Sequence, residues 1–293
     1  MMKKIIYRKP LGNQDRFMIS TIHTRTKNVR RGLELCKELY INMVNFDGVK
    51  PKDAYSRAIA CEEVGLDGAF KDTEFVQKFD FAVDKNSVAE VSRWQNVSVW
   101  DGNFSPEKLR MKVFRALVQG AVGIEYDSVY DGGITMDSKK GPLFRYIQDM
   151  NYRLTQIGRT LIALQCVGVY CSQDVIERDA SFAAVARPIS ESKILAEQEL
   201  PAGTAIGEFE DKEGNRYLLY QNVDYEDKST KAFSFQLKKK FRVYRVNPHD
   251  GKQMISKESI DTQKILIMPG DADLLRYQDT EEEACLLEYA LKK

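Results

Sequence analysis

The chain of 293 residues lacks several features by which enzyme classes are recognised in a sequence. It has only two histidines, His23 and His249, and two isolated histidines argue against a catalytic zinc site. No glycine-rich loop with a phosphate-binding lysine and no Gly-x-Ser-x-Gly motif occurs. We therefore expect neither nucleotide chemistry nor a hydrolase of the nucleophile-elbow type, and we expect no metal and no cofactor.

The chain also lacks an excess of charge of one sign and a long apolar run. Its 44 basic and 43 acidic residues leave a formal net charge of +1, so no global field recruits nucleic acid or an anionic membrane. No segment approaches the roughly 18 apolar residues of a membrane span, and the basic N-terminal residues lack the apolar stretch of a signal peptide. We expect a soluble protein without nucleic-acid or membrane partners, either cytoplasmic or secreted with its signal removed.

The cysteines and the one lysine run carry no functional signal. Five scattered cysteines, an odd number, are interpreted as reduced and partly buried thiols. Lys238, Lys239 and Lys240 lie inside an alternating strand pattern and are interpreted as a solvated face.

The first part of the chain, up to residue 164, alternates strand-like and helix-like segments. Such alternation predicts a parallel sheet. Strands are expected at 17–22, 41–48, 66–70, 79–83, 97–102 and 120–127, and helices at 28–39, 51–64, 87–93, 105–120 and 142–164. Six strands are fewer than the eight of a closed barrel. The sequence therefore predicts, over residues 1–165, a (β/α)8-type barrel that is shortened or incomplete.

After residue 164 the hydrophobic pattern changes to a period of two. Short strands are expected at 167–170, 207–209, 217–220, 232–237, 241–244 and 265–267, with turn residues between them. This spacing predicts an antiparallel β-sandwich over residues 166–293. We expect the sandwich to have a structural role rather than to bind sugar independently.

Acidic residues stand at the C-terminal ends of several expected strands, where parallel α/β proteins carry their chemistry. Asp101 follows Trp100 at one strand end, and Glu125 and Asp127 flank Tyr126 at another. Alternation along the strand directs Glu125 and Asp127 to one face and Tyr126 to the other. For each acid a structural role, in a turn or a salt bridge, stays open.

Three earlier acids, Asp47, Asp72 and Asp84, also follow expected strands. Each is a candidate for a second carboxyl group, and each is alternatively a helix N-cap or a turn residue. His23 follows the first strand and is either a ligand-binding side chain or a packed or surface residue.

Two stretches resemble a known family. Residues 110–124 begin with an arginine and end with the sequence Gly-Ala-Val-Gly-Ile. Residues 151–161 begin with an asparagine and continue as an amphipathic helix. Both are similar to the last helices and the eighth strand of TIM-barrel glycoside hydrolases of the β-galactosidase-like group. The C-terminal part also resembles such enzymes, through residues 207–209, 217–222 and 269–275.

The resemblance implies a glycoside hydrolase that acts on an oligo- or polysaccharide with two carboxyl groups. Asp101 would be the nucleophile or base, Glu125 a second catalytic or sugar-positioning acid, and Asp72, or instead Asp47 or Asp84, the general acid. The substrate-binding residues would be Trp100, Tyr126, Asp127, Tyr130, Asp47 and His23.

The alternative is a catalytically inactive barrel that binds carbohydrate or another protein. The shortened N-terminal half has no Asn-Glu signature for the fourth strand, from which such barrels take their acid/base. Because an incomplete barrel leaves strand edges unpaired, we also expect a homodimer or a segment that covers the edge.

Overall fold

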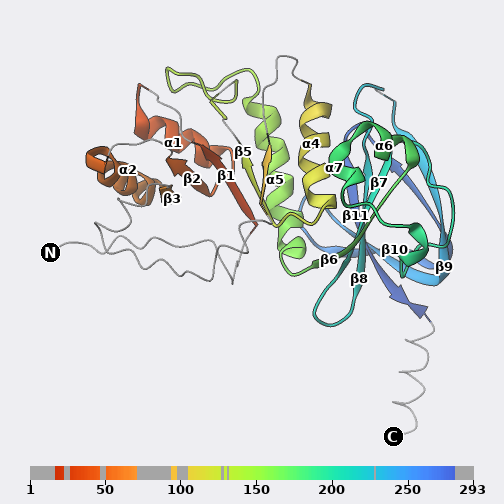
Figure 1. Ribbon diagram of the computed structural model, residues 1–293. Coiled ribbons are helices and arrows are strands. Elements are labelled where there is room, and N and C mark those ends of the chain that lie inside the picture. The colour runs from red at the N-terminus through yellow and green to blue at the C-terminus, as the bar shows by residue number, and fades with distance from the viewer. Residues whose placement is uncertain are drawn as a thin grey trace, which may run out of the picture. The chain divides into compact units, whose positions relative to one another are not determined.

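The computed structural model describes residues 17–22, 27–46, 51–70, 94–97, 105–126, 129–130, 132–227 and 229–280. Contacts divide the chain into two compact units, residues 1–104 with 121–162 and residues 105–120 with 163–293. Figure 1 shows the helices and strands of both. Within the described ranges, no helix is long and apolar enough to cross a membrane.

The first unit contains a parallel sheet of five strands in the order β3-β2-β1-β5-β4. The strands are β1 (Met18–Ile22), β2 (Met43–Phe46), β3 (Asp67–Phe70), β4 (Trp94–Val97) and β5 (Gly123–Tyr126), and the helices are α1 (Val29–Glu38), α2 (Pro51–Val64) and α5 (Phe144–Leu161). These elements confirm the expected alternation, although β4 begins at Trp94 rather than at position 97. The strand expected at 79–83 and the helix expected at 87–93 lie outside the described residues.

The strand order distinguishes this sheet from an open doubly wound sheet. In a doubly wound sheet the first three strands have the order 3-2-1, and the fourth strand of the chain then pairs with the first. Here the last strand, β5, pairs with β1, and β4 lies beyond it. In a closed barrel the first strand pairs with the last strand, as β1 pairs with β5 here. In the described sheet β3 and β4 are the two edge strands, and they are not paired with each other. The structure thus confirms a parallel, partly barrel-like α/β sheet.

Local signals in the sequence account for where the first helix begins. The Asn28 side chain accepts a hydrogen bond from the backbone N–H of Arg31 at 3.0 Å, as an N-cap residue does. Leu33, Leu35 and Cys36 are fully buried along one side of α1. The helix therefore forms where a cap precedes an apolar stripe.

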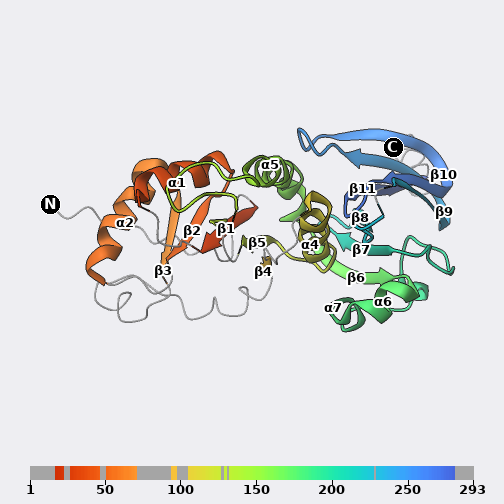
Figure 2. The ribbon, with the colours of Figure 1, turned by 90° about the horizontal axis from the view of Figure 1, so that it is seen from above.

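Buried polar side chains hold α1 and α5 to the sheet. The wholly buried Tyr126 on β5 donates its hydroxyl hydrogen to Asn151 Oδ1 on α5, at 2.7 Å. The Asn151 amide, also fully buried, donates in turn to the carbonyl oxygen of Leu39 at 2.8 Å. Figure 2 shows α1, α2 and α5 on the same side of the sheet.

The second unit contains an antiparallel sheet of six strands in the order β10-β9-β11-β8-β7-β6. The strands are β6 (Gln165–Cys171), β7 (Thr204–Glu210), β8 (Arg216–Asn222), β9 (Lys231–Val246), β10 (Gln253–Ile267) and β11 (Ala272–Asp279). Helices α4 (Pro106–Val118), α6 (Gln173–Arg178) and α7 (Ala180–Ala183) and a 3-10 turn at Ile189–Glu191 complete it.

The sheet bends over itself, so that one continuous sheet supplies both layers of the expected sandwich. β11 pairs with residues 241–245 of β9 only, whereas β10 pairs with β9 at both 231–236 and 241–246. The ring of Phe235 on β9 lies 4.9 Å from that of Tyr220 on β8, although these strands are not neighbours in the sheet. Three register shifts between residues 255 and 262 of β10 mark irregular pairing, of the kind that bends strands.

β9 is a single strand where the sequence predicted two. The lysines at 238–240 do not interrupt it, because the alternation continues through them. Between 233 and 243 its buried apolar residues all stand at odd positions: Phe233, Phe235, Leu237, Phe241 and Val243. Only the buried Val246 at its end departs from this alternation. Lys238 and Lys240 are exposed, while Lys239 is half-buried and pairs with Asp279.

Helix α4 packs against β7 and β8 of this sheet. The buried Gln221 amide donates to the carbonyl oxygen of Met111 at 2.9 Å. At Gly207 of β7, a Cβ atom would lie 2.6 Å from the carbonyl oxygen of Val118, so only glycine fits that close approach. Although α4 connects β4 to β5 in the chain, its contacts group it with the second unit.

A buried carboxylate, Glu208 on β7, fixes the segment that follows the 3-10 turn. It accepts hydrogen bonds from the Ser192 hydroxyl at 2.6 Å and from the backbone N–H of Lys193 at 3.1 Å. Glu208 is 1% exposed. Two residues along the strand, Glu210 forms an ion pair with the Lys193 ammonium at 3.1 Å, near the surface.

We expect Glu208→Ala to lower the free energy of unfolding by about 2–4 kcal/mol, because it leaves buried donors without an acceptor. Glu210→Ala, which removes a surface ion pair to the same lysine, should cost less than about 1 kcal/mol. Urea unfolding of the two variants measures both. Equal losses would show that the buried carboxylate does not hold this segment.

We expect Tyr126→Phe to destabilise the protein by about 1–2 kcal/mol, because Asn151 Oδ1 loses its donor in the interior. Tyr146→Phe, at a tyrosine that is 48% exposed on α5, is the matched control and should be close to neutral. Thermal and urea unfolding compare them. A Tyr126→Phe variant as stable as this control would contradict the role of the hydroxyl.

Candidate functional site

The candidate site is the edge of the parallel sheet where its strands end. Every strand pair in this sheet is parallel, so all five C-terminal ends meet at one edge. Most residues expected from the sequence to act or to bind follow these ends in the chain. Of them, His23, Asp47, Asp72, Asp84, Trp100, Asp101 and Asp127 lie outside the described residues.

The described part of the site is a short row of two polar side chains, Ser20 on β1 and Glu125 on β5. Ser20 on β1 and Asn96 on β4 are both register partners of Glu125 on β5. The Ser20 hydroxyl donates to Glu125 Oε2 at 3.3 Å. Ser20 is fully buried and Glu125 is half-buried, so the Ser20 hydroxyl helps to orient a side chain that keeps part of its surface exposed.

This row lies on the sheet face opposite the described helices. Tyr126 points to α5, and side chains alternate along a strand, so Glu125 points to the other face. In a barrel that face is the interior, which ends at the mouth. The predicted alternation of Glu125 and Tyr126 is therefore observed, while a functional role of Glu125 stays a prediction. Ser20 was not anticipated, and its only signal was a pair of polar residues, Ser20 and Thr21, within an apolar strand.

The two tyrosines expected to contact sugar lie in the interior instead. Tyr126 is fully buried and its hydroxyl is bonded to α5. Tyr130 is 5% exposed, and its hydroxyl lies 3.4 Å from the Cys36 sulfur. Their burial leaves little ring surface for a ligand, because both rings pack within the first unit.

The chemistry available in the described part of the site is that of a carboxylate with a hydroxyl neighbour. Among the described residues, no three His, Cys, Asp or Glu side chains form a group that could hold a metal ion. Burial raises the pKa of the Cys36 thiol to about 12, so it is a poor nucleophile near neutral pH. The described part of this edge thus offers one carboxylate, Glu125, and the Ser20 hydroxyl beside it.

No known protein-family profile matches the chain, and no curated protein matches it in sequence. Among solved structures it resembles a β-L-arabinopyranosidase of glycoside hydrolase family 27 from Geobacillus stearothermophilus. The identity is 7% and the TM-score 0.34, over 86% of this chain and 61% of that one.

It also resembles the α-galactosidase of Saccharomyces cerevisiae, at 9% identity and a TM-score of 0.36, over 82% of this chain and 73% of that one. An α-amylase from Anoxybacillus is similar at 12% identity and a TM-score of 0.34, over 84% of this chain and 60% of that one. The chain spans about 61% of the length of the arabinopyranosidase. At these TM-scores the similarities say nothing about activity. A function can be argued only from the residues of this chain.

We expect Cys36 to resist alkylation by iodoacetamide at pH 8 in the folded protein, because its thiol is buried and almost entirely protonated there. In urea the same thiol should react readily. Peptide mass mapping after timed quenching measures both rates. Equal rates in the folded and unfolded chain would show that Cys36 is accessible and would reopen it as a nucleophile.

Proposed function

We propose that the first unit binds a carbohydrate at the C-terminal edge of its sheet and hydrolyses a glycosidic bond with two carboxyl groups. The observation that carries the proposal is the half-buried Glu125 carboxylate, oriented by Ser20 on the face opposite the helices. A carboxylate and a hydroxyl at the end of a barrel-like sheet suit a sugar, whose hydroxyls both donate and accept hydrogen bonds.

The second carboxyl group of the proposal is Asp101, which follows β4 in the chain. β4 and β5 are hydrogen-bonded neighbours. Two carboxyl groups about 5–5.5 Å apart would be the arrangement of a retaining glycosidase, and about 6.5–9.5 Å that of an inverting one. In this proposal Asp101 is the nucleophile or base, Glu125 is its partner, and Asp72 is the reserve candidate for the acid.

The sugar-binding part of the proposal includes the residues that follow the other strand ends. Asp127 and Asp47 directly follow β5 and β2, and His23 directly follows β1. Trp100 precedes Asp101 and would offer an aromatic face to the sugar ring. Tyr126 and Tyr130 are not part of the proposal, because both are buried.

A second candidate function is sugar binding without turnover. The described sheet has five strands in barrel order, whereas a closed barrel has eight. The N-terminal half of the sequence has no Asn-Glu signature for the fourth strand, from which such barrels take their acid/base, and this favours a binding module over an enzyme. Both candidates use the same edge and the same Glu125.

Hydrolysis of a panel of aryl α- and β-glycosides tests the proposal with the wild type and three variants. We expect turnover by the wild type and losses of at least about 100-fold in Glu125→Gln and in Asp101→Asn, because each removes a carboxyl group from the reaction. Glu34→Gln, in the partly exposed ion-pair cluster of α1, should keep full activity.

Equal turnover by the wild type and Glu125→Gln would contradict the role of this residue. If a folded wild type turns over no substrate but binds a sugar saturably, and Glu125→Gln abolishes that binding, the second function replaces the first.

A further inference from the structure

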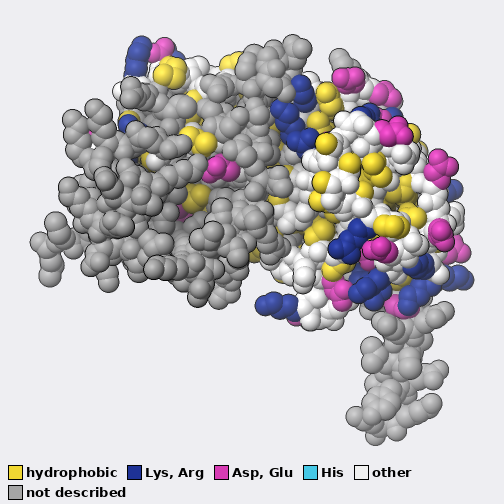
Figure 3. Space-filling view, viewed as in Figure 1, with side chains coloured by type: hydrophobic (Ala, Val, Ile, Leu, Met, Phe, Trp, Pro, Cys, Tyr) yellow, Lys and Arg dark blue, Asp and Glu magenta, His cyan; other side chains and the backbone are white. Residues whose placement is uncertain are grey.

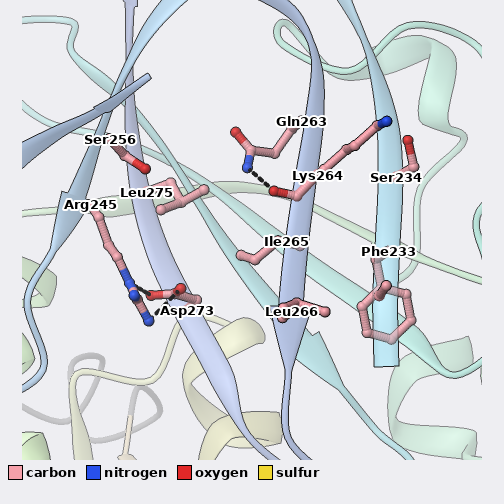
Figure 4. Close-up of a pocket in the computed structure, with 11 residues that line it drawn as sticks. Phe233, Ser234, Arg245, Ser256, Gln263, Lys264, Ile265, Leu266, Asp273 and Leu275 are labelled. Carbon is pink, nitrogen blue, oxygen red and sulfur yellow. Dashed lines mark hydrogen bonds and ion pairs between the residues drawn. The ribbon is translucent and has the colours of Figure 1, made fainter. Parts of the chain in front are cut away.

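The second unit has a cavity of its own, of about 470 Å³, lined by strands β9, β10 and β11. This volume lies within the range of small-molecule sites. Figure 4 shows the side chains that line it. The unit carries acidic, basic and apolar side chains side by side on the face in Figure 3, so it has no field of one sign there. Any specificity at the cavity therefore depends on local groups.

Gln263 is the unusual residue in this cavity. It is 4% exposed, and its amide nitrogen donates to the carbonyl oxygen of Lys264 at 2.9 Å. That bond fixes which amide atom is oxygen, because a flipped amide would place two oxygens in contact. The oxygen Oε1 is buried and has no hydrogen-bond donor among the described residues. In Figure 4 it is turned away from Lys264.

An unpaired buried acceptor is unfavourable, and native structures contain few of them. A ligand that donates a hydrogen bond would satisfy it. Because Oε1 accepts and cannot donate, the ligand contributes a hydroxyl or an N–H group at this point.

Two of the three charged side chains in the lining, Arg245 and Asp273, neutralise each other, and the third is Lys264. Arg245 and Asp273 form a two-bond ion pair, Nε to Oδ1 at 3.0 Å and Nη2 to Oδ2 at 2.9 Å. In Figure 4 the Lys264 ammonium extends away from this pair. Because the Arg245 and Asp273 charges are already paired and the Lys264 ammonium extends away from them, the inner part of the cavity offers hydrogen bonds and not an unpaired charge, which suits a neutral ligand.

The rest of the lining combines a hydroxyl with aliphatic surface. Ser256 faces the cavity together with Ile265 and Leu275. A ring with hydroxyls on a C–H framework matches this mixture. An extended peptide fits less well, because it would bind through the backbone groups of the edge strand β10, whereas Gln263 lies on the inward side of that strand.

We propose that this cavity binds one neutral sugar residue, with Gln263 Oε1 accepting a hydrogen bond from a sugar hydroxyl. This replaces the purely structural role expected for the sandwich. The proposal does not rest on hydrolysis by the first unit, because every lining residue belongs to the second.

The experiment is a titration of the full chain with galactose, glucose and xylose, each up to about 50 mM, followed by amide chemical shifts in NMR. Glucuronate and a neutral tetrapeptide are added in parallel. We expect saturable shifts around residues 256, 263 and 275 with at least one neutral sugar, and weaker shifts with glucuronate.

Gln263→Leu should weaken that binding at least about tenfold, while unfolding in urea shows equal or higher stability, because the unpaired acceptor is gone. Gln253→Leu, on the exposed part of the same strand, is the matched control and should bind as the wild type does. Asp273→Asn leaves Arg245 without its partner and should shift the preference toward glucuronate.

Glu125→Gln separates this site from the proposed active site, and it should leave the shifts at the cavity unchanged. The proposal is overturned if no neutral sugar shifts these residues, if Gln263→Leu binds as tightly as the wild type, or if the tetrapeptide alone shifts them. Loss of hydrolysis with these shifts intact would contradict only the function proposed for the first unit.

Discussion

The pairing of β1 with β5 is the interaction on which the first unit depends. It joins the start of the unit to a strand more than a hundred residues later, and it sets Ser20 opposite Glu125 in the register. A shift of one residue would turn Glu125 toward the helices and Tyr126 toward the other face. The buried bond between Tyr126 and Asn151 opposes such a shift, because it would be lost. The position of the carboxylate thus follows from packing on the opposite side of the sheet.

Buried polar groups have different roles in the two units. In the first, the Asn151 amide and the Tyr126 hydroxyl are paired and join sheet to helix. In the second, Glu208 is paired and fixes a loop, whereas one oxygen of Gln263 has no described partner. Paired groups of this kind stabilise a fold; Gln263 differs from the other buried residues with an unpaired polar atom, such as Gln221, because it lines a cavity in which a ligand could donate to it.

Much of the architecture could be predicted from the sequence, because it depends on local signals. The alternation of strands and helices, the Asn28 cap and the change to period two after residue 164 all correspond to observed elements. The partner of α4 could not be predicted, since an amphipathic pattern shows that a face is buried but not against what. β9 was predicted as two strands because the lysines at 238–240 interrupt the apolar run without interrupting the alternation.

The candidate site was predictable only in part. Strand alternation correctly placed Glu125 opposite Tyr126, but the sequence could not show that Ser20 is its neighbour, because that depends on which strands pair. Nor could it show that both tyrosines are interior. Since Asp101 lies outside the described residues, its role stays a prediction.

The most direct test of the central claim is the carboxyl carbon resonance of Glu125 in selectively labelled protein during titration with the sugar that the chain binds. The account predicts a saturable shift of this resonance, with the same midpoint as the overall binding curve. In the Gln263→Leu variant, in which sugar binding at the cavity of the second unit is weakened, a bound sugar that leaves the Glu125 carboxyl resonance unchanged would contradict the assignment of this sheet edge as a carbohydrate site.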